Sequence, residues 1–94
     1  MKEQLIQTKI IKYLEKKWYI VINIIKTNKN WLPDLLVLIW KWKHFWIEVK
    51  QETWILSKIQ EYRIKTLREN WDLVWIPYGF QDFIKQFEII EKSL

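Results

Sequence analysis

The apolar residues at the start of the chain recur with the period of a helix. Four of them share the spacing i, i+4, i+7 and i+8: Ile6, Ile10, Tyr13 and Leu14. Residues at these spacings lie on one side of an α-helix. The acidic Glu3 belongs to the same side, because positions 3, 7, 10 and 14 are neighbours on a helix. The pattern predicts an amphipathic helix over residues 3–17.

Three extended segments are predicted in the middle of the chain. Residues 19–25 are mostly aromatic or β-branched, which favours a strand. Residues 35–39 are continuously apolar, as a central strand buried on both faces should be. Residues 44–50 alternate, which sorts their side chains between two faces of a strand. One face holds Phe45, Ile47 and Val49, and the other holds Trp46, Glu48 and Lys50.

Two more helices, with a short strand between them, are predicted in the second half. Ser57 and Gln60 fit a capping box, in which Ser57 is the N-cap residue and Gln60 is the third helical residue. The helix is expected to reach about Asn70 and to turn four side chains inward: Ile59, Tyr62, Thr66 and Leu67. Residues 73–76 form a short strand closed by Pro77. The last helix has one apolar face, made of Phe80, Phe83, Ile84, Phe87 and Ile90.

The predicted order is therefore α-β-β-β-α-β-α, which indicates a mixed α/β domain with its sheet packed between helices. The 94 residues provide enough chain for one core, so residues 1–94 are expected to form a single domain. The longest apolar run, Leu35–Trp40, has six residues, whereas a membrane-spanning helix needs about 20. The chain has no cysteine and no smooth apolar segment at its start, so we expect a soluble cytoplasmic protein.

The charge balance is compatible with a nucleic-acid partner. The formal net charge is +5, and the cationic residues are 14 Lys and 2 Arg. Lysines neutralise backbone phosphates and release their condensed counterions. A positive net charge also serves solubility alone, so the charge by itself does not decide between these two explanations.

The numbers of tryptophan and glycine are unusual. The chain has eight Trp, one Gly and no Ala, although glycine usage of about 7% is normal. Several Trp stand where turns favour glycine: Trp40 and Trp42 lie between two apolar runs, and Trp71 follows a predicted helix end. One hypothesis is that seven of them are glycines encoded by UGA in a lineage with a variant genetic code: Trp18, Trp31, Trp40, Trp42, Trp46, Trp54 and Trp71. The alternative is a genuinely Trp-rich protein.

The segments 34–39 and 44–50 bring charged residues together if they pair as a hairpin. Opposed positions then sum to about 82 or 83, so Asp34 faces Glu48 or Val49. Opposed side chains have Cβ atoms about 4.5–5.5 Å apart, which lets two carboxylates share a divalent cation. Lys50 lies on the same face as Glu48. The alternative is that Glu48 and Lys50 point to solvent or form an ordinary ion pair, while Asp34 caps a turn after Pro33.

A family resemblance extends over most of the chain. Leu32-Pro33-Asp34, followed after thirteen residues by Glu48-Val49-Lys50, resembles the PD-(D/E)XK nuclease motif. More narrowly, the chain resembles the small stand-alone VRR-NUC domains of phages and bacteria. Four pieces resemble that family in order: Glu3-x-x-Ile6-Gln7, Trp31-Leu32-Pro33-Asp34, Ile47-Glu48-Val49-Lys50 and Leu56-Ser57-x-x-Gln60. Trp31 and Trp46 depart from it beside the acidic residues, and Trp71 stands where the family usually has glycine.

The resemblance implies a restriction-endonuclease-like fold and a role for each motif residue. Asp34, Glu48, the Val49 backbone carbonyl and Glu3 are implied to bind Mg²⁺ or Mn²⁺, which prefer oxygen ligands. Lys50 is implied to orient the attacking water or to neutralise charge on the phosphate. Gln60 is implied to position Lys50 or that water. Two alternatives stay open, because Gln60 is also a capping residue and Glu3 is also an acid that the helix dipole favours.

The resulting hypothesis is a metal-dependent endonuclease that hydrolyses DNA, with a Holliday junction or a flap as the substrate that the resemblance favours. A homodimer is expected, because two sites are needed to cut two strands. Four loop lysines are expected to form a rim facing DNA, because both loops should border the site: Lys26, Lys29, Lys41 and Lys43. Solvated loop lysines are the alternative to that rim. The competing functions are a catalytically inactive DNA-binding relative and a small protein-interaction module.

Overall fold

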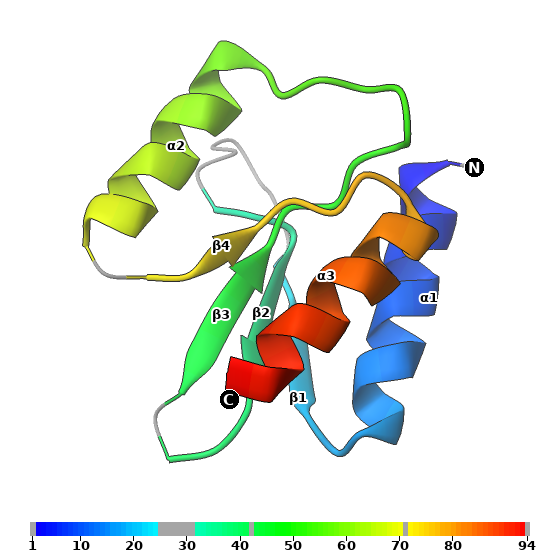
Figure 1. Ribbon diagram of the computed structural model, residues 1–94. Coiled ribbons are helices and arrows are strands. Elements are labelled where there is room, and N and C mark those ends of the chain that lie inside the picture. The colour runs from blue at the N-terminus through cyan, green and yellow to red at the C-terminus, as the bar shows by residue number, and fades with distance from the viewer. Residues whose placement is uncertain (1, 25–31, 42, 71, 94) are drawn as a thin grey trace.

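The computed structural model describes residues 2–24, 32–41, 43–70 and 72–93 (Figure 1). Its elements follow the predicted order. They are α1 (Glu3–Lys16), β1 (Ile20–Asn23), β2 (Leu35–Leu38), β3 (His44–Ile47), α2 (Lys58–Glu69), β4 (Val74–Trp75) and α3 (Phe80–Ser93). Within the described residues, no helix is long and apolar enough to cross a membrane.

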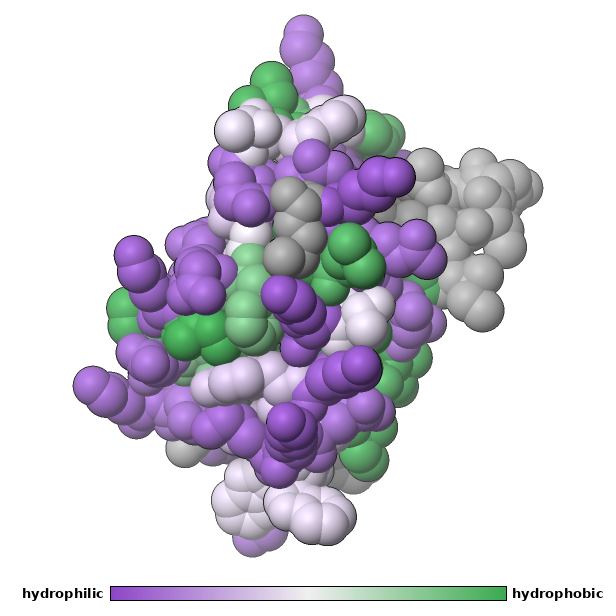
Figure 2. Space-filling model, turned by 90° about the vertical axis from the view of Figure 1, so that its right-hand side faces the viewer, coloured by the Kyte–Doolittle hydropathy of each residue, from purple (hydrophilic) through white to green (hydrophobic). Residues whose placement is uncertain are grey.

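The four strands form one mixed sheet in the order β1-β2-β3-β4. Strand β2 pairs antiparallel with both β1 and β3, and β4 pairs parallel with β3. Helices α1 and α3 lie side by side against the sheet, and α2 lies apart from them beside β4 (Figure 1). The exposed side of the molecule over α1 is largely hydrophilic (Figure 2).

The core lies between the sheet and the pair formed by α1 and α3, and the predicted apolar faces of these elements are confirmed. Its buried members are Ile6, Ile10, Leu14, Leu35, Val37, Phe45, Ile47, Val49, Phe83 and Phe87. The ring of Tyr13 meets Phe83 and Phe87 edge-on, with centroids 5.6 and 5.7 Å apart. Such contacts add to the hydrophobic stabilisation of the α1–α3 seam. The aromatic face of the last helix is therefore core.

The predicted inward face of α2 was partly wrong. Ile59 and Tyr62 are 52% and 61% exposed, whereas Ile64 is only 4% exposed. Gln60 is half-buried because its side chain reaches Glu48 on the sheet. That polar contact sets the rotation of α2 about its axis, and Ile64 then follows Gln60 on the buried side at i+4.

The strand predicted over residues 44–50 is shorter in the structure, since β3 ends at Ile47. The backbone after Ile47 nevertheless continues to form hydrogen bonds with β4 and the residues that follow it. Glu48 N–H donates to the Trp75 carbonyl at 2.8 Å and Lys50 N–H to the Pro77 carbonyl at 3.1 Å, and Lys50 also forms a parallel bridge with Tyr78. The first predicted strand, 19–25, is observed as β1, and its residue 25 lies outside the described residues.

Candidate active site

The hairpin register brings Asp34 and Glu48 to the same end of the sheet. Leu35 is the Cα partner of Ile47, so paired positions sum to 82, the first of the two values expected. Asp34 and Glu48 are the next residues outward on the two strands. The antiparallel register therefore brings two carboxylate-bearing residues, separated by thirteen others in sequence, to adjacent positions.

Asp34 is held on both sides of its strand. Its side-chain Oδ2 accepts a hydrogen bond from the Val49 N–H at 2.8 Å, and its backbone carbonyl accepts one from Ile24 N–H at 2.9 Å. A carboxylate that accepts a backbone N–H forms a charge-assisted bond, which is stronger than a neutral one. The orientation of this carboxylate is therefore determined by the backbone, so it does not move freely as a loop side chain would.

Glu48 and Lys50 are buried on the face of the sheet opposite to the core. Their exposed fractions are 3% and 6%, and they are the buried charged side chains of the described residues. The expected alternation is confirmed, because Phe45, Ile47 and Val49 on the other face are core residues. The alternative in which Glu48 and Lys50 point to solvent is wrong.

Lys50 carries a positive charge on a side chain that is only 6% exposed. Burial of a charged side chain removes hydration, and this loss is costly unless other groups or ligands offset it. Natural proteins retain buried charges mainly in polar networks or where they serve a site. Lys50 is therefore a candidate residue for binding an anionic ligand at this end of the sheet.

Gln60 joins α2 to the site. Its capping role is observed, and its other contact is with Glu48, whereas the resemblance implied Lys50 or the attacking water as the group that it positions. Its Oε1 accepts the Ser57 N–H at 3.0 Å, and its own N–H donates to Ser57 Oγ at 3.2 Å, which completes the capping box. Its Nε2 donates to Glu48 Oε1 at 3.3 Å. Because the amide oxygen of Gln60 is used in the cap, its amide nitrogen is directed at the Glu48 carboxylate. The capping box therefore helps to orient Glu48.

Glu3 is half-buried at the first position of α1. Among the residues that the structure describes, no three Asp, Glu, His or Cys side chains lie close enough to one another to hold a metal ion. Glu3 is therefore not grouped with both Asp34 and Glu48. Asp34, Glu48, Lys50 and Gln60 are brought together, and the Val49 backbone lies between them through its bond to Asp34.

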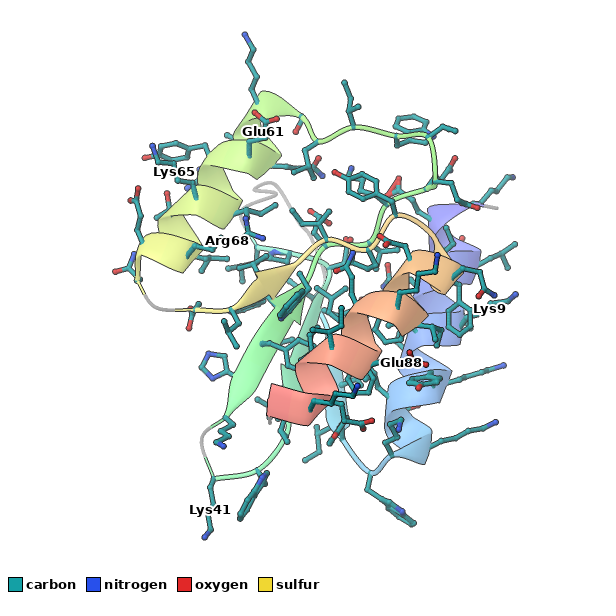
Figure 3. All side chains as sticks on the ribbon, viewed as in Figure 1. Lys9, Lys41, Glu61, Lys65, Arg68 and Glu88 are labelled. Atoms are coloured by element: carbon teal, nitrogen blue, oxygen red, sulfur yellow. The ribbon has the colours of Figure 1, made fainter. Side chains whose placement is uncertain are left out.

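The predicted lysine rim was wrong for the second loop. Lys41 and Lys43 are exposed at the turn between β2 and β3, and Figure 3 shows Lys41 at the end of the sheet away from α2. An antiparallel hairpin places its turn at one end and its open ends, here Asp34 and Glu48, at the other. Lys26 and Lys29 lie outside the described residues.

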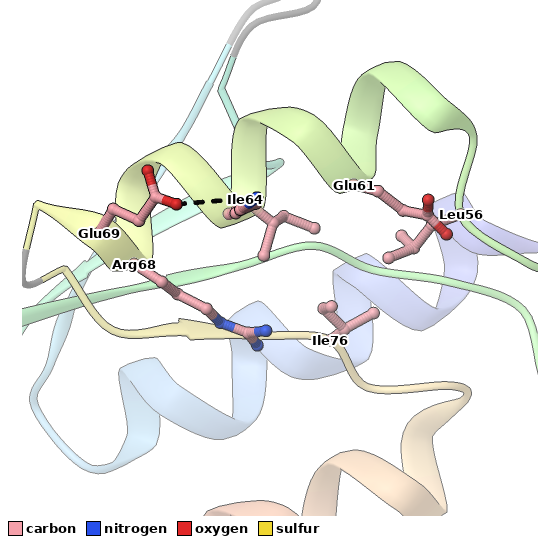
Figure 4. Close-up of a pocket in the computed structure, with 7 residues that line it drawn as sticks. Leu56, Glu61, Ile64, Arg68, Glu69 and Ile76 are labelled. Atoms are coloured by element: carbon pink, nitrogen blue, oxygen red, sulfur yellow. Dashed lines mark ion pairs between the residues drawn. The ribbon is translucent and has the colours of Figure 1, made fainter.

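A groove that sequence reasoning missed lies between α2 and β4 (Figure 4). Its lining residues are Leu56, Glu61, Ile64, Lys65, Arg68, Glu69 and Ile76. Lys65 and Glu69 form an exposed ion pair at 3.9 Å along its rim. Five of the lining residues belong to α2, and the pattern of α2 alone does not predict the groove, because Leu56 before the helix and Ile76 after β4 complete its wall. None of the groove residues belongs to the Asp34–Glu48–Lys50 group.

Comparison with known proteins shows which known fold the chain has. No family model matches the sequence, and no curated protein matches it either. A solved structure described as a VRR_NUC domain superposes with a TM-score of 0.82 at 22% sequence identity, and the match covers 92% of this chain and 94% of that one. At this identity the likeness bears on the fold, and the mixed sheet with its three helices agrees with it. The chain therefore has the fold of a VRR_NUC domain.

Proposed function

We propose that this chain is a metal-dependent nuclease that hydrolyses phosphodiester bonds in DNA. The observation that carries the proposal is the pair of buried charged residues Glu48 and Lys50 at the end of the sheet where the backbone holds the Asp34 carboxylate. Two acids and an ammonium group at one end of a sheet suit a phosphate ester better than a neutral substrate. The VRR_NUC fold supports the same reaction class.

The donor set fits a hard divalent cation, Mg²⁺ or Mn²⁺. Asp34 and Glu48 offer carboxylate oxygens, and the Val49 carbonyl is a further oxygen on the segment that Asp34 already binds. Glu3 is proposed as an additional ligand from the first turn of α1. A cation bound there supplies a more acidic coordinated water and offsets the negative charge of the phosphate.

The side chains of the site have separate roles in this proposal. Lys50 neutralises charge that develops on the phosphate, or orients the attacking water. Its side chain is largely buried, so bulk solvent screens its charge less than it would screen a surface lysine. Gln60 is a positioning residue that keeps the Glu48 carboxylate in one orientation through the 3.3 Å hydrogen bond. The Val49 N–H does the same for Asp34 through the 2.8 Å bond.

We further propose that the protein acts as a homodimer on DNA and that branched DNA, such as a Holliday junction or a flap, is its substrate. A domain with principal extents of 31 × 31 × 24 Å has little surface with which to surround a duplex. Two copies related by a twofold axis would present two sites to two strands. The net charge of +5 favours the approach of the phosphate backbone.

The experiment that tests this proposal measures cleavage of a four-way junction and of a linear duplex in the presence of Mn²⁺. Three proteins are compared: the parent chain, a chain with glycine at the seven Trp positions in question, and the Lys50→Ala variant of that glycine-containing chain. Cleavage that requires metal and disappears in the Lys50→Ala variant is expected. A folded protein that binds Mn²⁺ and cuts neither DNA would overturn the nuclease proposal.

A catalytically inactive DNA-binding relative is the second candidate, and Trp46 is the observation that favours it. Trp46 is half-buried on the same face of β3 as Glu48, so a large ring lies next to the proposed site. This candidate predicts a shift of DNA mobility without cleavage. A small interaction module, the third candidate, predicts neither DNA binding nor stabilisation by Mn²⁺.

A further inference from the structure

Helix α1 ends in a Schellman motif, and the residue at its C′ position is Trp18. Lys17 is the C-cap. The Trp18 N–H donates to the Glu15 carbonyl at 3.0 Å, and the Tyr19 N–H donates to the Leu14 carbonyl at 3.3 Å. These are the two hydrogen bonds that define the motif, and the motif requires a left-handed backbone at C′.

Trp18 has that left-handed backbone, with φ of +70°. A side chain at such a φ brings its Cβ too close to the following carbonyl, so a bulky residue there is rare and glycine is usual. The encoded glycine of the chain, Gly79, has φ of +92°. Trp18 is also 92% exposed, so packing of its ring does not offset the strain. The backbone at position 18 is a glycine backbone.

A second helix end carries the same signature. Asn70 is the C-cap of α2, and the Asp72 N–H donates to the Leu67 carbonyl at 3.1 Å. This is the longer of the two Schellman bonds. The residue between Asn70 and Asp72 in sequence is Trp71, which itself lies outside the described residues. Two helices therefore end with this bond, and at both ends the sequence has Trp where the motif favours glycine.

The other described Trp residues do not share this backbone, because Trp18 and Lys41 are the described residues other than glycine that have a positive φ. Trp40 and Trp54 are 57% and 55% exposed, whereas Trp75 packs against the core from β4. The Nε1 atoms of Trp46 and Trp75 are both buried without a hydrogen-bond partner among the described residues, so this feature does not distinguish them. The backbone evidence for glycine therefore rests on position 18.

We propose that position 18 is glycine in the protein as its own cell makes it, because that cell reads UGA codons as glycine. The same codon then applies at 31, 40, 42, 46, 54 and 71, whereas Trp75 is encoded by UGG. The chain would have eight glycines in place of one. Glycine at position 46 would also remove the ring beside Glu48, a consequence that bears on catalysis only if the proposed nuclease function holds.

The gene itself provides the first test. Codons TGA at position 18 and TGG at position 75 are the expected result. In protein isolated from the source cells, the tryptic peptide that follows Lys17 should begin with glycine by mass spectrometry. A TGG codon at position 18, or a peptide that begins with Trp, would overturn the proposal. Neither result depends on whether the protein is a nuclease.

The second test measures the backbone preference with a matched pair of variants of the recombinant chain. Trp18→Gly and Trp18→Ala both remove the exposed ring, but only glycine relieves the left-handed strain. We expect Trp18→Gly to raise the thermal midpoint by roughly 5 °C over Trp18→Ala, a shift typical of one relieved strain of this kind in a domain of this size. Equal midpoints for the two variants would show that position 18 does not require glycine, and would overturn the proposal.

Discussion

At the scale of single residues, the candidate site is defined by charged side chains that are buried in the folded protein. Lys50 is 6% exposed and Glu48 is 3% exposed. The Glu48 carboxylate accepts a hydrogen bond from Gln60. Burial of the Lys50 charge costs hydration, and the proposed binding role would explain why this cost is tolerated.

Replacing Lys50 by Met should therefore separate stability from activity. Methionine has a similar length and no charge, so Lys50→Met removes the desolvation cost without opening a large cavity. We expect the free energy of unfolding to rise by about 1 kcal/mol, while metal-dependent cleavage is lost. Urea denaturation measures the first quantity and junction cleavage the second. A clear loss of stability would show that the ammonium group is held by a favourable contact.

At the scale of elements, the N-terminus of α2 combines a structural and a functional device. The capping box holds the first turn, and its Gln60 extends from that turn to Glu48. Helix α2 has few other contacts with the sheet, since Ile64 is its buried residue among those described. The position of α2 over the site thus depends on this cap more than on a broad apolar face.

The cap predicts a contrast between two variants. Ser57→Ala removes the N-cap hydroxyl and should lower the free energy of unfolding by about 1 kcal/mol, with most of the cleavage activity retained at a temperature where the protein is folded. Gln60→Ala should cost a similar amount of stability and also slow cleavage, because Glu48 loses its orienting donor. Thermal unfolding and single-turnover cleavage measure the two effects. Equal cleavage rates would assign Gln60 to the cap alone.

The seam between α1 and α3 predicts a dependence of stability on alkaline pH. Lys17 Nζ forms an ion pair with Glu91 at 3.1 Å. The hydrogen bond that Lys17 donates to Glu91, with smaller charge effects, outweighs desolvation and raises the pKa of Lys17 above its ordinary 10.5. Burial, and then the Glu91 carboxylate, raises the pKa of Tyr19 above its ordinary 10.0.

Both groups hold their protons more tightly in the folded protein than in the unfolded chain. Their contribution to stability is therefore complete below about pH 10 and is lost as the pH rises through the raised values. The thermal midpoint should fall as the pH rises above about 10. In Glu91→Gln the fall should be smaller, because the partner that raises both pKa values is gone. An unchanged fall in Glu91→Gln would assign it to the other lysines and tyrosines.

At the scale of the whole molecule, two halves of the chain meet at one site. Asp34 comes from the strand that begins the hairpin, Glu48 and Lys50 follow the strand that ends it, and Gln60 comes from a helix that packs beside β4. A cation that binds across these elements binds only the folded state. It must therefore stabilise the fold by linkage.

Mn²⁺ at about 100 times its dissociation constant should raise the free energy of unfolding by about 2.7 kcal/mol. Asp34→Asn should abolish this stabilisation, because an amide oxygen is a weaker ligand than a carboxylate. Glu3→Gln reports on Glu3: a reduced Mn²⁺ effect would assign it to the ligand set, and an undiminished effect would leave it as a first-turn acid. Calorimetry with and without Mn²⁺ makes the measurement. Stabilisation of Asp34→Asn equal to that of the parent would contradict the proposed site.

Much of the fold followed from local patterns, because helices and strands have periods that a sequence displays directly. The apolar stripes of α1 and α3, the alternation across β3 and the capping box of Ser57 and Gln60 were all predicted and are all present. The expected hairpin left two registers open, in which Asp34 faces either Glu48 or Val49. The structure has the first of them, because Leu35 pairs with Ile47.

Tertiary structure alone decided the rest, because these features depend on elements that meet in space. The rotation of α2 follows its contact with Glu48, so Ile64 is buried while Ile59 and Tyr62 are exposed. Lys41 lies away from the site because a hairpin separates its turn from its open ends. The sequence alone determined which residues carry charge and which periods the elements have. Tertiary packing decided that Glu48 and Lys50 are buried, since burial is a property of neighbours that are distant in sequence.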